Sequence, residues 1–164
     1  MTSKKVAKML NEQINAELHS AYIYWDIAKY FECKGLKGFA SWYEEQAKEE
    51  ISHAKKIYGY MQNEGCYIKF EQISSLKEDI TDDLSAAKLA LKHEKDITAL
   101  INNIYAQCYK DADYRTMKFL EWFIDEQAEE EDNAREVVTL IKLAGNSKSA
   151  LYLADVKMGK RKAA

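Results

Sequence analysis

Six side chains of the kinds that bind divalent metal ions stand in a regular order along the 164-residue chain. They are, in order, Glu17, Glu50, His53, Glu94, Gln127 and Glu130. Carboxylate, imidazole and amide groups without a thiolate suit a hard or borderline cation, and iron, manganese and zinc all remain open. Four carboxylates also balance the charge of two divalent ions. The residue types therefore predict a two-metal site in which Glu50 is the natural bridge between the ions.

The spacing of these residues indicates one helical hairpin that is used twice. The separation from Glu17 to Glu50 is 33 positions. The separation from Glu94 to Gln127 is also 33, and a shift of 77 positions maps the first pair onto the second. Residues equally far from the turn of an antiparallel hairpin lie at the same height, here about 24 Å from each turn. A single Glu-x-x-His on a helix is usually a coincidence, so the shared spacing carries the prediction that these side chains meet in mid-bundle.

Long helices are required to hold the six side chains in place. Apolar residues at spacings of three and four predict helices over 4–31, 36–64, 82–109 and 114–143, and a short fifth helix over 148–158. The chain contains no proline, which favours helices over other structures. Residues 65–81 lack helical rhythm, yet they are long enough to run the length of a bundle.

The predicted fold class is all-α: a four-helix bundle of two helical hairpins joined by a long crossover, plus the short C-terminal fifth helix. We expect a single domain over 1–164. The bundle would occupy about 4–145, and a basic tail would follow at 159–164.

Composition limits the setting in which the protein works. A net charge of -3 gives no electrostatic reason to expect nucleic acid as a partner. We see no secretory signal and no apolar stretch of the ~18–20 residues that a membrane span needs. Three separated cysteines, Cys33, Cys66 and Cys108, are typical of reduced thiols. The expectation is a soluble, cytoplasmic protein without a membrane partner.

Several stretches carry a family resemblance over nearly the full length of the chain. They are Asn-Glu-Gln-Ile-Asn-Ala-Glu at 11–17, Glu-Glu-Ile-Ser-His-Ala-Lys-Lys at 49–56, His-Glu at 93–94, Trp-Phe-Ile-Asp-Glu-Gln-Ala-Glu-Glu-Glu at 122–131 and Leu-Tyr-Leu-Ala-Asp at 151–155. With them the chain resembles the prokaryotic non-haem ferritins. The resemblance implies a ferroxidase that oxidises Fe(II) with oxygen or hydrogen peroxide. It also implies iron storage as Fe(III) mineral inside a homo-oligomeric shell of about 24 subunits.

The resemblance assigns roles to individual positions. It implies a first iron held by Glu17, Glu50 and His53, and a second held by Glu50, Glu94 and Glu130 with Gln127 close by. It further implies a third iron site formed by Glu49, Glu126, Glu129 and Glu130. Tyr24 would sit beside the iron pair and supply an electron or a hydrogen bond; as a sequence fact alone, it fits a core aromatic equally well.

Positions at which this sequence differs from related families reduce the number of possible functions. Bacterioferritins place a haem-ligating methionine directly after the bridging glutamate, where this chain has Ile51, so no haem is expected. The alternative to storage is a small di-iron peroxidase of the rubrerythrin-like type. A metal-free structural bundle is the third reading, against which the buried acids argue.

Overall fold

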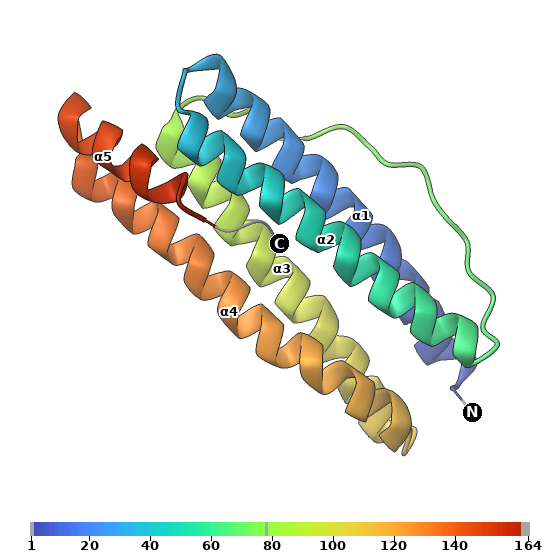
Figure 1. Ribbon diagram of the computed structural model, residues 1–164. Helices are drawn as coiled ribbons and strands as arrows, with labels where there is room; N and C mark the ends of the chain where they lie inside the picture. The colour runs from blue at the N-terminus through green and yellow to red at the C-terminus, as the bar shows by residue number, and fades with distance from the viewer. Residues whose placement is uncertain (1, 78, 162–164) are drawn as a thin grey trace.

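A computed structural model describes residues 2–77 and 79–161, which form five helices (Figure 1). The helices are α1 (Lys4–Cys33), α2 (Lys37–Asn63), α3 (Asp83–Lys110), α4 (Tyr114–Ala144) and α5 (Lys148–Met158). The all-α prediction is confirmed, and every predicted helix end lies within two residues of the observed one. Part of the predicted basic tail, residues 162–164, lies outside the described residues. None of the helices described is long and apolar enough to cross a membrane.

Polar side chains begin most of the helices. Ser3, Asp82, Asp113 and Ser147 each accept a hydrogen bond from a backbone N–H in the first turn of the helix that follows. The start of α2 has no such neighbour in sequence, because Leu36 precedes it. Asp155 of α5 supplies the missing acceptor instead, with its Oδ1 2.9 Å from the backbone nitrogen of Phe39. The fifth helix therefore completes the start of the second.

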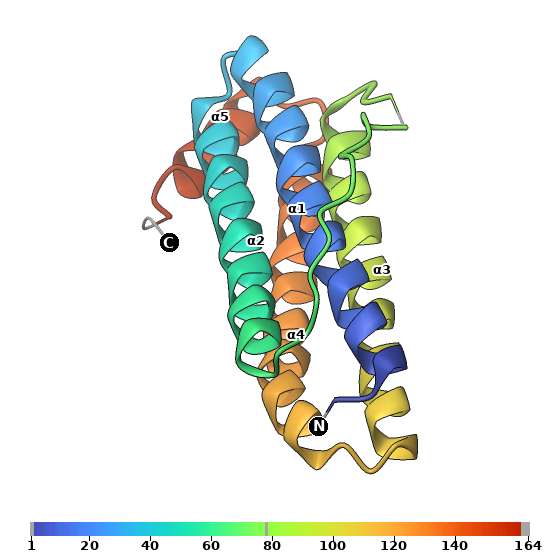
Figure 2. The same ribbon diagram turned by 90° about the vertical axis from the view of Figure 1, so that its right-hand side faces the viewer.

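The long link between α2 and α3 runs beside α1, as Figure 2 shows. Two asparagines of α1 hold it. The backbone N–H of Lys69 donates to Asn11 Oδ1 at 2.7 Å, and the N–H of Glu71 donates to Asn15 Oδ1 at 2.8 Å. Both amide nitrogens return hydrogen bonds to the Lys69 carbonyl, at 3.1 and 3.0 Å. The predicted crossover between two hairpins is thus present.

The apolar core is divided into two clusters along the bundle. One contains the aromatic side chains Tyr24, Phe31, Phe39 and Tyr43 and lies toward the turn between α1 and α2. The other lies toward the opposite end and contains mainly aliphatic side chains of α1, α2 and α3 with two residues of α4. Four packed helices could share one continuous apolar core, so the gap between these two clusters needs an explanation. The predicted polar residues occupy the level between the clusters.

The buried face of α3 differs from the one predicted. Steps of three and four residues from Glu94 place Thr98 and Tyr105 in the predicted inward seam with Ile101, but both are only half-buried. Ile97 and Ile104, one position earlier, are 2% exposed each and fill the core instead. In a helix with 3.6 residues per turn, the positions three and four residues after Glu94 lie on either side of the same face, so either could turn inward. Isoleucine at 97 is more often buried than threonine at 98.

The close approach of α5 to α2 generates a first prediction. A β-carbon on Gly38 would lie 1.8 Å from the backbone oxygen of Asp155. Gly38→Ala should therefore displace α5 and lower the free energy of unfolding by about 1–3 kcal/mol. Denaturant unfolding followed by circular dichroism measures this.

Gly59→Ala in the same helix is the matched control, because its β-carbon would meet nothing within 4 Å. This variant should gain about 0.5–1 kcal/mol. Equal responses from the two variants would contradict the close packing of α5 on α2.

Candidate metal centre

All four bundle helices contribute to one buried polar layer. Its members are 0–3% exposed and comprise Glu17 from α1, Glu50 and His53 from α2, Glu94 from α3, and Gln127 and Glu130 from α4. The six side chains predicted to meet in mid-bundle all lie in this layer. The 33-residue spacing thus correctly predicted which residues of the two helical hairpins lie at the same level.

Ligand atoms of these residues gather into two overlapping groups. Oxygen or nitrogen atoms of Glu17, Glu50 and His53 lie within 4.8 Å of one another, as do oxygens of Glu50, Glu94 and Glu130. Glu50 belongs to both groups. Its Oε2 lies 3.7 Å from Nδ1 of His53. Two neighbouring cations could therefore share one carboxylate, which is the arrangement of a two-metal site.

Amide and phenol groups orient the outer oxygens of this layer. Gln13 donates to Glu17 Oε1 at 2.8 Å, and Gln46 donates to Glu130 Oε2 at 2.7 Å. The Tyr24 hydroxyl donates to Glu94 Oε1. Each donor is neutral, so it fixes a carboxylate without cancelling its charge. The negative charge of the layer remains available to a cation.

Two carboxylate oxygens of the layer are among the buried polar atoms that have no hydrogen-bond partner in the described part of the chain. They are Oε2 of Glu17 on α1 and Oε1 of Glu50 on α2, and both residues belong to the first ligand group. An unsatisfied buried carboxylate oxygen is costly, and native proteins rarely keep one without a reason. A bound divalent cation would satisfy both atoms. The donor set thus fits a metal better than it fits a hydrogen-bonded structural core.

The buried acids of the layer have raised pKa values. Burial raises the pKa of Glu17 and of Glu50 well above the ordinary range, and their like-charged neighbours add to the shift. Burial and the nearby Glu94 raise the pKa of Glu130 to about 8. Burial, followed by the charge of Glu94, also raises the pKa of Tyr24 well above its usual value. Without a metal the layer retains protons at neutral pH.

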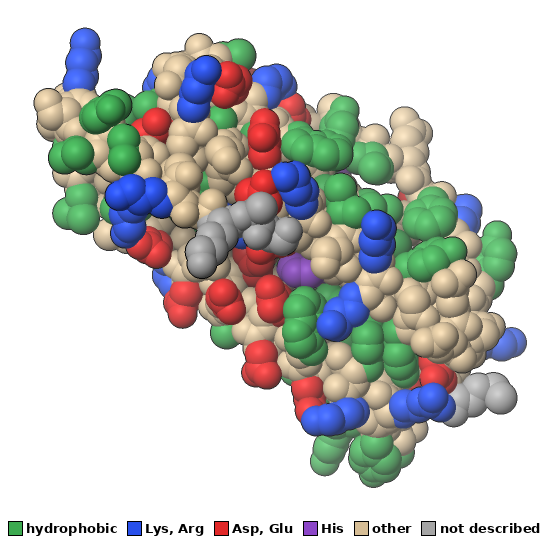
Figure 3. Space-filling model, in the orientation of Figure 1, with side chains coloured by type: hydrophobic (Ala, Val, Ile, Leu, Met, Phe, Trp, Pro, Cys, Tyr) green, Lys and Arg blue, Asp and Glu red, His purple; other side chains and the backbone are tan. Residues whose placement is uncertain are grey.

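Of the residues predicted to form the third iron site, Glu126 lies in a group of potential ligands formed by the described residues, whereas Glu49 and Glu129 do not. Glu126 joins a third group of potential ligands with His53 and Glu130, and its Oε1 lies 3.7 Å from His53 Nε2. Glu129 is exposed and reaches the group only through its charge, which acts on Glu126. Glu49 is half-buried and forms an ion pair with Arg161. On the face carrying α2, α4 and α5, acidic side chains gather beside a visible histidine (Figure 3).

Gln127 faces the layer as a hydrogen-bond donor. Its Nε2 lies 3.1 Å from Glu94 Oε2, 3.2 Å from the Glu94 carbonyl and 3.3 Å from the hydroxyl of Thr98. It therefore stabilises one of the carboxylates in this structure, in addition to occupying a position equivalent to Glu50 in the repeat.

Sequence reasoning missed the donors that orient the layer. Gln13 stands one helical turn before Glu17, and Gln46 stands one turn before Glu50. A glutamine four residues before Glu17 and before Glu50 was therefore a readable signal in the first hairpin. Arg161 gave no such signal, because its partner is 112 positions away.

The chain is similar in sequence and in structure to known proteins. Residues 7–144 match the family model of the ferritin-like domain. The chain is 35% identical to a bacterial non-heme ferritin of Staphylococcus aureus (strain USA300) over 161 residues, which cover 98% of this chain and 97% of that protein. The corresponding protein of Staphylococcus epidermidis is 37% identical with the same coverage. The open pore ferritin of the archaeon Archaeoglobus fulgidus superimposes with a TM-score of 0.96 at 34% identity, covering 99% of this chain and 100% of that one. A humanized archaeal ferritin reaches 0.97, also at 34% identity, over 100% and 99% of the two chains.

The shifted pKa of Glu130 predicts how stability depends on pH in the metal-free protein. Glu130 titrates near its ordinary value of 4.5 when unfolded and at about 8 when folded. The unfolded chain loses this proton first, so the fold loses stability as pH rises from about 4.5 to about 8. Glu130→Gln should leave stability near pH 4.5 almost unchanged and raise it by a few kcal/mol above pH 8. Denaturant unfolding across that pH range, with a chelator present, measures the difference.

Glu129→Gln provides the control for this titration, since Glu129 is exposed one position away. Its stability profile should run parallel to that of the unaltered protein. A Glu130→Gln profile that also runs parallel would show that Glu130 has no raised pKa.

Proposed function

The chain belongs to the ferritin family, and we propose that it stores iron by oxidising Fe(II) at the buried centre and depositing Fe(III) mineral within a shell of identical subunits. The observation that carries this proposal is the pair of overlapping ligand groups sharing Glu50, with two carboxylate oxygens left unpartnered. The protein would work in the cytoplasm as a single-domain subunit over 1–164.

Fe(II) is the substrate, and the two groups would hold two of these ions side by side. Glu17, Glu50 and His53 would bind the first, and Glu50, Glu94 and Glu130 the second. Binding displaces the protons that burial keeps on these carboxylates, and the ions then satisfy the unpartnered oxygens. Tyr24 and the two glutamine donors keep the carboxylates in place while the charge changes.

Two adjacent Fe(II) ions suit the oxidation chemistry. Each ion gives up one electron, so a pair reduces dioxygen to hydrogen peroxide, or hydrogen peroxide to water, without a one-electron product. The role of the chain is to fix the spacing of the ions and to leave coordination positions open to the oxidant. Tyr24 donates a hydrogen bond to Glu94, and in this proposal it would supply a hydrogen bond or an electron during oxidation.

The outer acidic group gives oxidised iron a path away from the centre. Glu126 is a potential ligand together with His53 and Glu130, and its side chain is 25% exposed. Glu49 and Glu129 would complete this third site. It connects the buried pair with the surface, so Fe(III) leaving the second position meets acidic side chains on the way out.

The proposed shell of about 24 subunits rests on the family membership and on the surface of α5. Tyr152 and Leu153 of this helix are 64% and 66% exposed in the single chain, and Val156 is 40% exposed. An apolar face of this kind gains stability when a neighbouring subunit covers it.

Iron loading tests the storage function directly. Fe(II) is added in air at tens of ions per subunit, and protein and iron are followed together by size exclusion. Iron should co-elute with a shell-sized particle. Glu50→Ala, which removes a ligand common to both positions, should slow oxidation by roughly 100-fold or more. Glu44→Ala, at an exposed position of the same helix, should load normally.

Different results would identify other functions. Precipitated iron beside a small oligomer that retains about two ions per chain would favour the di-iron peroxidase. Unchanged oxidation in Glu50→Ala would remove the centre from the mechanism and leave a structural bundle.

Gln127 is expected to set how readily iron leaves the second position. Gln127→Glu adds a charged ligand beside Glu94 and Glu130, so it should bind iron there roughly tenfold more tightly and slow iron transfer to the mineral. The delay between oxidation and mineral growth, followed by absorbance, measures this transfer. Gln62→Glu places the same charge at an exposed position of α2 and should not lengthen the delay. An unchanged delay in Gln127→Glu would contradict the role given to this residue.

A further inference from the structure

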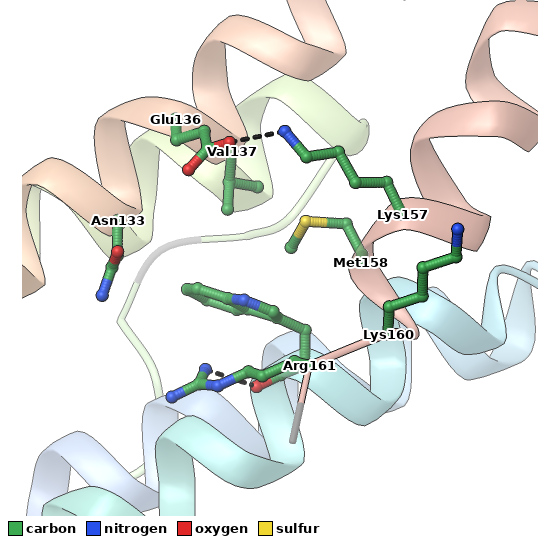
Figure 4. A pocket seen from close by; sticks show the side chains of 8 residues that line it. Asn133, Glu136, Val137, Lys157, Met158, Lys160 and Arg161 are labelled. Atoms are coloured by element: carbon green, nitrogen blue, oxygen red, sulfur yellow. Dashed lines mark hydrogen bonds and ion pairs between the residues drawn. The ribbon is translucent and has the colours of Figure 1, made fainter. Parts of the chain in front are cut away.

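The segment after α5 returns to the bundle and is attached to α2 by one side chain. The guanidinium of Arg161 lies 4.6 Å from the centre of the Trp42 ring, and its Nη1 donates to the Trp42 carbonyl at 3.2 Å. Its Nη2 lies 2.5 Å from Oε2 of Glu49. Figure 4 shows Arg161 beside a pocket of about 340 Å³ between this segment and α4. Three contacts of different kinds fix the position of the guanidinium.

Glu49, the partner of Arg161, is coupled to the metal centre. It directly precedes Glu50 in sequence. It also stands four positions before His53 on α2, so the two side chains are neighbours on one face of that helix. His53 belongs to the outer group with Glu126 and Glu130. In agreement with this placement, the charge of Glu49 contributes to the raised pKa values of Glu50, Glu126 and Glu130. The guanidinium thus occupies the Glu49 carboxylate that a metal ion at the outer site would also need.

We propose that Arg161 is a tethered cation that competes with iron for Glu49, so that the C-terminal segment controls how long iron stays at the outer site. While Arg161 holds Glu49, that carboxylate is withdrawn from the outer site and iron moves on. When Arg161 leaves, Glu49 becomes a ligand and iron is retained. This inference rests on the proposed iron chemistry of the centre.

A second ion pair, in the last turn of α5, shows that the Arg161 contact is distinct from ordinary surface pairing. Lys157 lies 2.6 Å from Glu136, and both of these side chains are 58% exposed. The side chains of Arg161 and Glu49 are 19% and 28% exposed. An ion pair that is partly removed from water, with a planar guanidinium stacked on an indole, holds its geometry far better than an exposed lysine pair. Figure 4 shows Lys157 directed toward Glu136, away from Arg161.

The test counts and ranks Fe(II) sites on the assembled protein by calorimetry without oxygen. The unaltered chain should show two tight sites and one weaker one. Arg161→Ala should tighten the weaker site by roughly tenfold, because Glu49 is then free of its competitor. Lys157→Ala removes a positive charge from the neighbouring last turn of α5 and should leave the weaker site as it was. Arg161→Lys keeps the charge but loses the stacking on Trp42, so it should tighten the weaker site less than Arg161→Ala does.

A double variant connects the effect to Glu49. In a Glu49→Gln background, Arg161→Ala should no longer change the weaker site, since the carboxylate for which the two cations compete is gone. An equal effect of Arg161→Ala with and without Glu49 would overturn the proposal, and so would an equal effect of Lys157→Ala. Absence of the two tight sites in the unaltered chain would instead refute the proposed function of the centre.

Discussion

The structure depends on four carboxylates buried in one layer of a helix bundle without a fixed positive charge to balance them. Glu17, Glu50, Glu94 and Glu130 are each no more than 2% exposed. Neutral side chains donate hydrogen bonds to Glu17, Glu94 and Glu130. One oxygen of Glu17 and one of Glu50 have no hydrogen-bond partner among the described residues. Such a layer costs stability when it is empty and ionised, and it gains stability when divalent ions enter. The apolar core is accordingly split into two clusters, which hold the four helices in register on either side.

The internal repeat places the layer, and its departures from symmetry make the two proposed metal positions unequal. Gln13 and Gln46 support carboxylates, whereas the positions 77 residues later are Ala90 and Phe123, which are apolar and buried. His53 likewise corresponds to a glutamate in the second half. One position therefore has an imidazole and the other has carboxylates with a neutral amide nearby. Unequal ligands suit a centre that receives two ions together and releases them one after the other.

The C-terminal segment connects the assembly of the bundle with the chemistry of its centre. Asp155 caps the start of α2 at Phe39, where Gly38 allows the two backbones to meet. Arg161 then reaches Glu49 farther along the same helix. About 16 Å of helix separate positions 38 and 49 at ~1.5 Å per residue. The helix α5 thus anchors the fold at Phe39, and the residues that follow it bring a positive charge beside the proposed metal centre.

The sequence by itself determined the helices, the hairpin pairing and the six residues of the polar layer, because periodicity and the 33-residue spacing are properties of the chain alone. It did not determine which face of α3 is buried, where Ile97 rather than Thr98 enters the core. Nor did it connect Arg161 with Glu49, 112 positions apart. Contacts of that kind depend on how α5 crosses α2. Only the packing of complete helices decides this, since no local pattern of residues records the angle at which two distant surfaces meet.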